Sequence, residues 1–427
     1  MGITAERLNE ARRLDAEDAL SALRKEFHLP GGSDANDVYF VGNSLGLQPK
    51  TVRASLAQVM DQWQDSAVHG HFRGKPAWMD LPEMISEQMA PLVGAGPHEV
   101  VVMNTLTVNL HLMLASFYRP EGRRTKILME DHAFPSDHQA IASHLQLHGL
   151  SAAEHLIIVS PTDGDSTIST AQVEAAINSH AQELALCLLP GVQYYTGQVF
   201  DMPRLTAVAR AHGIPIGFDL AHAAGNLELQ LHEWDMDFAC WCTYKYMNCG
   251  PGAPGGCFIH ERHAANIDHP RLAGWWGHRR DSRFQMAAEF VPPPTAQGWQ
   301  LSNPPILALA PMLPALEIFH SAGGMSALRQ KSRRQNAFFR RLLQERLGAR
   351  VQIVTPDQPQ ASGCQLSLEI RGLGRSGREV FERISAQGIH TDWREPNVIR
   401  AAPVPLYNTF QDIHRFVDVL EQCVTAS

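Results

Sequence analysis

Short apolar runs alternate with longer segments of helical periodicity through the middle of the chain. The periodic segments predict helices at 137–148 and 205–212. The apolar runs predict short buried strands at 126–129, 184–189, 214–218, 238–243 and 256–260. Short apolar strands that alternate with helices indicate a mainly parallel sheet that helices cover on both faces. In such a sheet the reactive side chains collect just beyond the carboxyl ends of the strands.

The pattern changes after a proline-rich stretch at 290–305, which precedes a predicted long helix at 306–321. Further on, shorter elements alternate, and the pattern predicts a strand at 364–370, a helix at 378–387 and a strand at 397–402. This second pattern indicates a smaller α+β unit, which we expect to include the amino-terminal segment as well. We therefore expect a large domain at 50–310 and a small domain made of 1–49 and 311–427.

The composition narrows the class of protein. The 427 residues are 44% apolar, enough for a large core, and carry a formal net charge of −8. That charge argues against a nucleic-acid-binding protein, and the ordinary apolar content argues against disorder. No apolar run is long enough to span a membrane, and the amino-terminal segment lacks the apolar core of a signal peptide. We expect a cytoplasmic protein that binds neither nucleic acid nor membrane.

The seven cysteines lie mostly among apolar neighbours, which predicts reduced, buried thiols. A cluster of cysteines and histidines could be imagined as a metal site: Cys240, Cys242, Cys249, Cys257, His260 and His263. However, these residues lie in strand-like apolar stretches and contain no C-x₂-C pair. Packing in the core is therefore the favoured interpretation, and we expect no metal.

A glycine motif in the same region resembles a dinucleotide-binding loop. Gly250, Gly252 and Gly255 match G-x-G-x-x-G, but that motif needs a preceding strand and a helix that starts inside it. Here Pro251 and Pro254 interrupt the motif, and a strand-like run follows. We expect a flexible or tight-turn loop between two strands.

Two polar residues that directly follow apolar strands suggest cofactor chemistry. Asp219 ends one strand, and Lys245 follows the next one between two tyrosines. A lysine cation at the mouth of a buried strand is costly unless it is paired, whereas a Schiff-base lysine reacts as the neutral amine. The pair suits pyridoxal phosphate, whose pyridine nitrogen takes a carboxylate partner and whose aldehyde takes a lysine. The alternatives are a helix-capping aspartate and a lysine that extends to solvent.

Two further features fit the same cofactor. Asn104, Thr105 and Thr107 open an apolar helix, and free N–H groups at a helix start favour a phosphate. The alternative for this segment is an ordinary threonine cap. His132 and Phe134 follow the strand at 126–129 and could face the cofactor ring, although a phenylalanine there is more often a core residue.

Nine sequence blocks between residues 39 and 420 resemble the kynureninase family, in the order of that family. They are SLGLQPK, NTLTVNLHLML, FPSDHQAI, GVQYYTGQVF, GFDLAHAAGN, DFACWCTYKYMNCG, GWWGH, LSNPPI and IRAAPVPLYN. Members of this family are dimeric pyridoxal-phosphate enzymes of the aspartate aminotransferase fold. The resemblance implies that architecture for this chain: a mainly parallel central sheet between helices, with a smaller α+β domain.

The resemblance also implies a set of cofactor contacts. They are Leu106, Thr107, Phe134, Asp137, Asp219, His222, Tyr244 and Lys245. In this set Lys245 forms the Schiff base and Asp219 pairs with the pyridinium nitrogen. Leu106 and Thr107 bind the phosphate, and Phe134 stacks on the ring.

Further residues are implied for the substrate and for the subunit interface. Trp275 and Asn303 should reach the cofactor of the neighbouring subunit. Arg400 should take the substrate α-carboxylate, for which a bidentate guanidinium is apt. His71 and Phe72 could frame the substrate ring and Asn303 could contact a ring substituent, with plain packing as the alternative.

The implied reaction is hydrolysis of the Cβ–Cγ bond of L-kynurenine or 3-hydroxy-L-kynurenine, which gives an anthranilate and L-alanine in tryptophan breakdown or pyridine-nucleotide supply. Lys245, Tyr244 and Asp219 are the expected catalytic residues, with Tyr244 as an acid and base. One departure is Pro190, where many relatives have a serine, so a hydroxyl contact is lost.

Other enzymes of the same fold remain alternatives, in particular a cysteine desulfurase or an aminotransferase. A desulfurase needs an exposed nucleophilic cysteine, whereas Cys364 opens an apolar strand. A regulator that only senses pyridoxal phosphate would need an added DNA-binding domain, for which the chain has no spare length.

Overall fold

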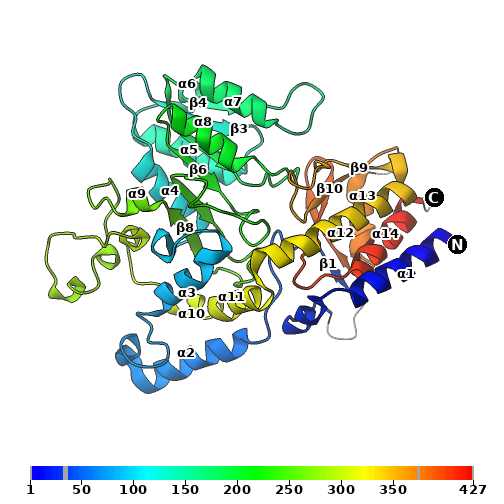
Figure 1. Ribbon diagram of the computed structural model, residues 1–427, viewed down its shortest axis with the longest axis horizontal. Helices are drawn as coiled ribbons and strands as arrows, with labels where there is room; N and C mark the ends of the chain where they lie inside the picture. Colours follow the sequence, from blue (N-terminus) through cyan, green and yellow to red (C-terminus); the bar gives the residue numbers. More distant parts are fainter. Residues whose placement is uncertain (1, 32–36, 373–375, 426–427) are drawn as a thin grey trace.

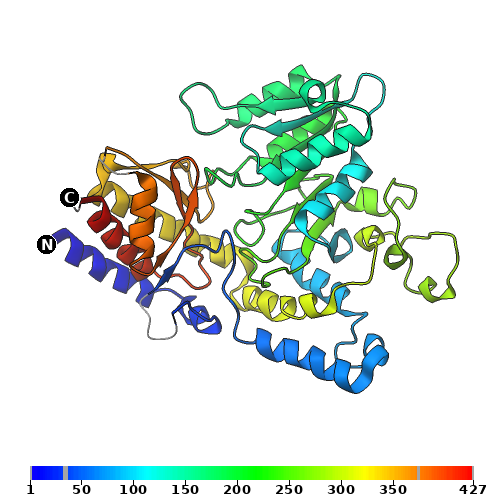
Figure 2. The same ribbon diagram turned by 180° about the vertical axis from the view of Figure 1, so that it is seen from behind.

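The computed structural model describes residues 2–31, 37–372 and 376–425. Two main sheets organise these residues, a large one in the middle of the chain and a small one near its end, and a third sheet has only two strands (Figure 1). Figure 2 shows from behind that each main sheet carries its own helices and that both chain ends lie on the small-sheet side.

The large sheet has seven strands in the order β2-β8-β7-β6-β5-β3-β4. Their bounds are β2 (Val100–Met103), β3 (Lys126–Glu130), β4 (Leu156–Val159), β5 (Leu184–Pro190), β6 (Ile216–Asp219), β7 (Phe238–Trp241) and β8 (Gly255–Ile259). Strand β8 runs antiparallel to both of its neighbours, and all other neighbouring pairs are parallel. Strand β2 therefore runs in the direction of β7, which confirms the mainly parallel sheet.

Both faces of most strands of this sheet are buried, which explains why those strands are largely apolar. Along β2, Val101 and Met103 pack into the core on one face, and Val100 and Val102 pack into the core on the other. The first core is closed by α4 (Leu106–Phe117) and α5 (Pro135–Leu147). The second is closed by α3 (Leu81–Met89), α7 (Thr170–Ser179), α8 (Met202–Ala211) and α11 (Met312–Ser321).

The small sheet is antiparallel, in the order β12-β13-β10-β9. Its strands are β9 (Val351–Ile353), β10 (Leu366–Ile370), β12 (Asp392–Arg394) and β13 (Val398–Ala401). The helices around it are α12 (Gly324–Arg346), α13 (Gly377–Ser385) and α14 (Phe410–Thr425). The amino-terminal helix α1 (Gly2–Ala16) packs against α14, and β1 (Val38–Tyr39) pairs with β11 (Ile389–His390).

The predicted helix at 306–321 is wrong in one respect, because the chain forms two helices there. Helix α10 (Ile306–Leu309) ends before Pro311, and α11 begins after it. Proline has no N–H to donate and clashes with the preceding turn, so it breaks the helical ladder. The predicted loop between two strands is confirmed: it joins β7 to β8, and Gly250 and Gly252 in it have left-handed φ values of 95° and 75°.

All seven cysteines are buried, as predicted. The sulfur atoms of Cys240 and Cys257 lie 3.4 Å apart between neighbouring strands, inside the core. Among the described residues, no single helix is both long and apolar enough to cross a membrane. Only segments 306–321 and 324–346 taken together, bent by 70°, reach that length and composition.

Candidate active site

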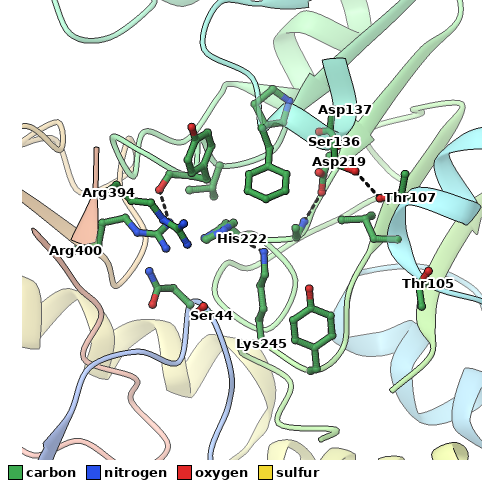
Figure 3. Close-up of a pocket in the computed structure, with 18 of the residues that line it drawn as sticks. Ser44, Thr105, Thr107, Ser136, Asp137, Asp219, His222, Lys245, Arg394 and Arg400 are labelled. Carbon is green, nitrogen blue, oxygen red and sulfur yellow. Dashed lines mark hydrogen bonds between the residues drawn. The ribbon is translucent and has the colours of Figure 1, made fainter. Parts of the chain in front are cut away.

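A cavity of about 440 Å³ lies at the carboxyl ends of strands β2, β3, β5, β6 and β7 (Figure 3). Its other wall comes from Asn43 and Ser44 in the loop after β1, and from Arg394 and Arg400 of the small sheet. The cavity thus lies between the two sheets. This is the place where a parallel sheet is expected to collect reactive side chains.

Lys245 and His222 meet in this cavity. Their Nζ and Nε2 atoms lie 3.2 Å apart. Burial lowers the pKa of His222 well below its usual range, and the positive charge of Lys245 lowers it further. The imidazole is therefore neutral near pH 7 and can accept a hydrogen bond from the Lys245 side chain. Its Nδ1 is buried with no hydrogen-bond partner among the described residues.

Asp219 combines a capping bond with a place in the cavity wall. Its Oδ1 accepts the Ala221 N–H at 2.7 Å, so the capping role proposed as an alternative is real. The carboxylate also lines the cavity next to Asp137 (Figure 3). The two roles are compatible because a carboxylate accepts several hydrogen bonds.

Two more buried carboxyl groups adjoin Asp219. Burial raises the pKa of Asp137 well above its usual range, and the charge of Asp219 raises it further. Burial also raises the pKa of Glu130 to about 8, with smaller contributions from Asp219 and Asp131. Burial and mutual repulsion therefore favour a single negative charge in this cluster. That charge could pair with one cationic group of a ligand.

An anion cradle forms where two helices start. Leu106 is the first residue of α4, and Thr107 Oγ1 lies 2.7 Å from Ser136 Oγ in the first turn of α5. Thr105 makes no side-chain capping bond, so the ordinary threonine cap is not what this segment provides. Two hydroxyls and free N–H groups at a helix start suit a phosphate.

Two of the aromatic residues expected at the site, Phe134 and Tyr244, line the cavity. Phe134 is 42% exposed, lines the cavity and lies edge-on to Tyr194, so it is not a core residue. Tyr244 lines the cavity as well, and burial raises the pKa of its hydroxyl. The suggestion that His132 faces the cofactor is not supported, because His132 lines a neighbouring cavity instead. Pro190, the last residue of β5, lines the cavity without a hydroxyl.

Arg400 lies on β13 and is 1% exposed. Its Nη1 donates to the Tyr194 carbonyl at 2.8 Å, and its Nη2 donates to Asp392 Oδ2. Arg394 on β12 shares the same carboxylate oxygen, at 3.0 Å from Nη2. A carboxylate ligand can therefore meet positive charge on this wall of the cavity.

Comparison with known proteins agrees with this geometry. The chain is 53% identical to the kynureninase of Xanthomonas euvesicatoria pv. vesicatoria, with 97% of both chains covered. It is 52% identical to that of Xanthomonas oryzae pv. oryzae, with 97% of this chain and 98% of the relative covered. The chain belongs to the kynureninase family. Residues 328–420 also match the kynureninase C-terminal domain, and residues 84–232 match the DegT/DnrJ/EryC1/StrS aminotransferase family.

Solved structures show that the kynureninase-family fold is shared more widely. A cysteine desulfurase from Thermococcus onnurineus covers 95% of the chain with a TM-score of 0.78 at 17% identity. A cystine C–S lyase in complex with cysteine persulfide covers 91% with a TM-score of 0.74 at 18% identity. These likenesses confirm the fold, a mainly parallel sheet between helices with a smaller α+β part.

Four residues that the kynureninase resemblance implies do not line the cavity of their own chain. Trp275 is 42% exposed, Phe72 is 59% exposed, Asn303 is exposed and His71 is half-buried. Trp275 and Phe72 each lie edge-on to Phe284. They therefore form an aromatic cluster on the surface.

Several cavity residues were missed by the sequence analysis. They are Asn43, Ser44, Glu130, Ser136, Tyr194 and Arg394. Ser44, Ser136 and Tyr194 lie inside quoted blocks, and Glu130 directly follows a predicted strand, so a signal existed for these four residues. Arg394 gave none, because an arginine in a polar, proline-containing segment is ordinary on a protein surface.

Proposed function

We propose that this chain is a pyridoxal-phosphate-dependent hydrolase that cleaves the Cβ–Cγ bond of L-kynurenine to anthranilate and L-alanine. 3-Hydroxy-L-kynurenine is the second candidate substrate. The observation that carries the proposal is that one cavity holds Lys245, the Asp219 cluster and the Thr107–Ser136 cradle. The high identity to kynureninases over nearly the whole chain supports this choice among enzymes of the fold.

The residues present fit pyridoxal phosphate. Asp219 would hold the pyridinium nitrogen, the cradle with Leu106 would hold the phosphate, and Phe134 would cover the ring. Oδ1 of Asp137 and Nδ1 of His222 are buried and have no hydrogen-bond partner in the described part of the chain, so both can meet a ligand. Contacts from Tyr244 complete the set. When bound, the cofactor supplies an electron sink for a carbanion at the substrate α-carbon.

The chain's own residues would move the protons. The Lys245 amine, released when substrate binds, lies at the centre of the cavity and would remove the substrate Cα proton. The neutral His222 can accept a hydrogen bond from the Lys245 amine and adds no positive charge beside it. Because burial raises the pKa of Tyr244, its hydroxyl stays protonated and would donate a proton after the carbon–carbon bond breaks. Arg400 would fix the α-carboxylate.

We further propose that the enzyme is a homodimer. Large apolar side chains are exposed along α2 (Val52–Ser66), the following turn and the 267–307 segment: Met60, Trp63, Val68, Phe72, Trp275, Phe284, Met286 and Leu307. A second copy would bury this surface. Trp275 of the partner subunit and Asn303 of the partner subunit would then complete each cavity, with His71 and Phe72 close to the substrate ring.

We also propose the expected domain division. The large domain comprises residues 50–310, and the small domain comprises residues 1–49 and 311–427. This division is supported by the packing of α1 on α14 and by the pairing of β1 with β11. The cytoplasmic location stays a prediction.

A cysteine desulfurase is disfavoured in spite of the shared fold. That reaction needs a reactive thiolate, but all seven cysteines are buried. For Cys364, burial raises the thiol pKa to about 12.

The test is product formation by the purified protein supplied with pyridoxal phosphate. We expect L-kynurenine to yield fluorescent anthranilate and L-alanine in equal amounts, and cysteine to yield no alanine. Alanine from cysteine without anthranilate from kynurenine would overturn the proposal.

A further inference from the structure

Arg394 and Arg400 line one wall of the cavity, and both donate hydrogen bonds to the same carboxylate, that of Asp392. Asp392 Oδ2 accepts from Arg394 and from Arg400. Among the described residues, Asp392 is the one acidic partner of either guanidinium. The side chains of Arg394 and Arg400 lie next to each other and face the middle of the cavity (Figure 3). This wall therefore carries one more positive charge than negative.

The hydrogen-bonding capacity of the pair is also unfilled. The Nε atoms of Arg394 and Arg400 are both buried with no hydrogen-bond partner among the described residues. A buried donor without a partner is destabilising, so such donors usually mark a missing acceptor. An anion is the acceptor that would satisfy both donors and the excess charge together.

Electrostatic effects within the site agree with this placement. Burial lowers the pKa of Arg400 and the charge of Arg394 lowers it further, while Asp392 opposes both effects. Both guanidinium groups also help to lower the pKa of His222, behind burial and Lys245. The positive charges of Arg394 and Arg400 therefore act on His222, which lies beside Lys245.

We propose that Arg394 is a second substrate-binding residue, whose guanidinium binds the substrate α-carboxylate together with that of Arg400. Asp392 then serves as the shared anchor that orients both side chains. The inference rests on the proposed function, since it takes an amino-acid substrate with a free α-carboxylate. The proposal also makes the substrate α-carboxylate a determinant of specificity. The neutral amide of the same amino acid would leave the excess positive charge of the two arginines unpaired.

The test compares L-alanine with L-alaninamide as ligands of the holoenzyme, followed by the change in the absorption of the bound cofactor. We expect Arg394→Gln to weaken L-alanine binding roughly ten- to hundred-fold. Binding of L-alaninamide should stay within about two-fold of wild type, because the amide does not use the second cation. The KM for L-kynurenine should rise more than kcat falls.

Two further variants keep the test decisive. Arg394→Lys keeps a charge but loses the planar fork, so L-alanine binding should be intermediate. Arg378→Gln removes an exposed arginine that pairs with Glu382 on α13 and should bind both ligands like wild type. If Arg394→Gln binds L-alanine normally, or if it and Arg394→Lys weaken both ligands equally, Arg394 only anchors Asp392 and the proposal is wrong.

The result separates the two proposals. Wild type that binds L-alanine through Arg394 but releases no anthranilate would overturn the reaction and keep the assignment of Arg394. Wild type that releases anthranilate while Arg394→Gln binds L-alanine normally would overturn the assignment alone.

Discussion

Lys245 Nζ lies 3.2 Å from His222 Nε2, although the two residues follow different strands. The contact exists because β6 and β7 are parallel neighbours, with Asp219 opposite Cys240 at their carboxyl ends. The segments that leave these two strands must therefore start side by side. The buried imidazole stays neutral and gives the lysine a partner without adding a second cation.

This arrangement predicts that His222 contributes a pH dependence to stability. Its folded-state pKa lies below the unfolded value of about 6.5, so the unfolded chain binds the extra proton as the pH falls. The free energy of unfolding should therefore be retained above that pH and fall below it, by about 1.4 kcal/mol per pH unit from this residue. Denaturant titrations of the apoprotein at several pH values measure the slope.

His222→Gln should reduce that slope, whereas His132→Gln at an exposed position should leave it unchanged. Part of the slope will persist in His222→Gln, because burial also lowers the pKa values of His144 and His269, to about 4. Equal slopes for wild type and His222→Gln would contradict the neutral, buried imidazole.

Asp219→Asn should remove the negative charge that the carboxyl cluster provides. We expect kcat to fall by at least about hundred-fold, because an amide cannot stabilise a positive charge on the cofactor nitrogen. The control is Asp201→Asn, which alters an aspartate that accepts from Arg204 N at the start of α8. Steady-state anthranilate release measures both, and a nearly normal rate for Asp219→Asn would rule out its role.

The cradle predicts a defect in cofactor affinity. Thr107→Val and Ser136→Ala each remove one hydroxyl of a pair 2.7 Å apart. Each variant should bind pyridoxal phosphate about ten-fold more weakly, as expected for a lost hydrogen bond to a charged group. Titration of the apoprotein with cofactor, followed by fluorescence quenching, gives the affinity. Excess cofactor should restore the rate, and a rate that stays low at saturation would point to a different role.

The proposed dimer predicts complementation between two inactive variants. One subunit would carry Lys245→Ala and the other Trp275→Ala with Asn303→Ala. A mixed dimer would then hold one site with both defects and one intact site, so the mixture should recover roughly a quarter of wild-type activity. Activity is measured after the two proteins are unfolded together and refolded, and again after separate refolding. Recovery only in separately refolded samples, or in neither, would contradict shared sites.

The sequence predicted the strand ends well because local patterns determine them. Asp219 and Lys245 follow apolar runs whose burial on both faces is visible in the chain itself. The place of Arg394 in the cavity wall was missed because it depends on how the small sheet packs against the large one. A local sequence pattern carries no information about that packing. The break at Pro311 was missed because the apolar periodicity continues on both sides of it. That periodicity does not show that proline lacks the backbone N–H that a helix needs.

The most direct test of the account is to reduce the holoenzyme with borohydride, digest it and locate the cofactor by mass spectrometry. The account predicts a phosphopyridoxyl group on the peptide that contains Lys245, and its absence from Lys245→Ala, which should also release no anthranilate. The exposed control Lys25→Ala should be labelled and active like wild type. Labelling of another lysine, or anthranilate release by Lys245→Ala at the wild-type rate, would contradict the central claim.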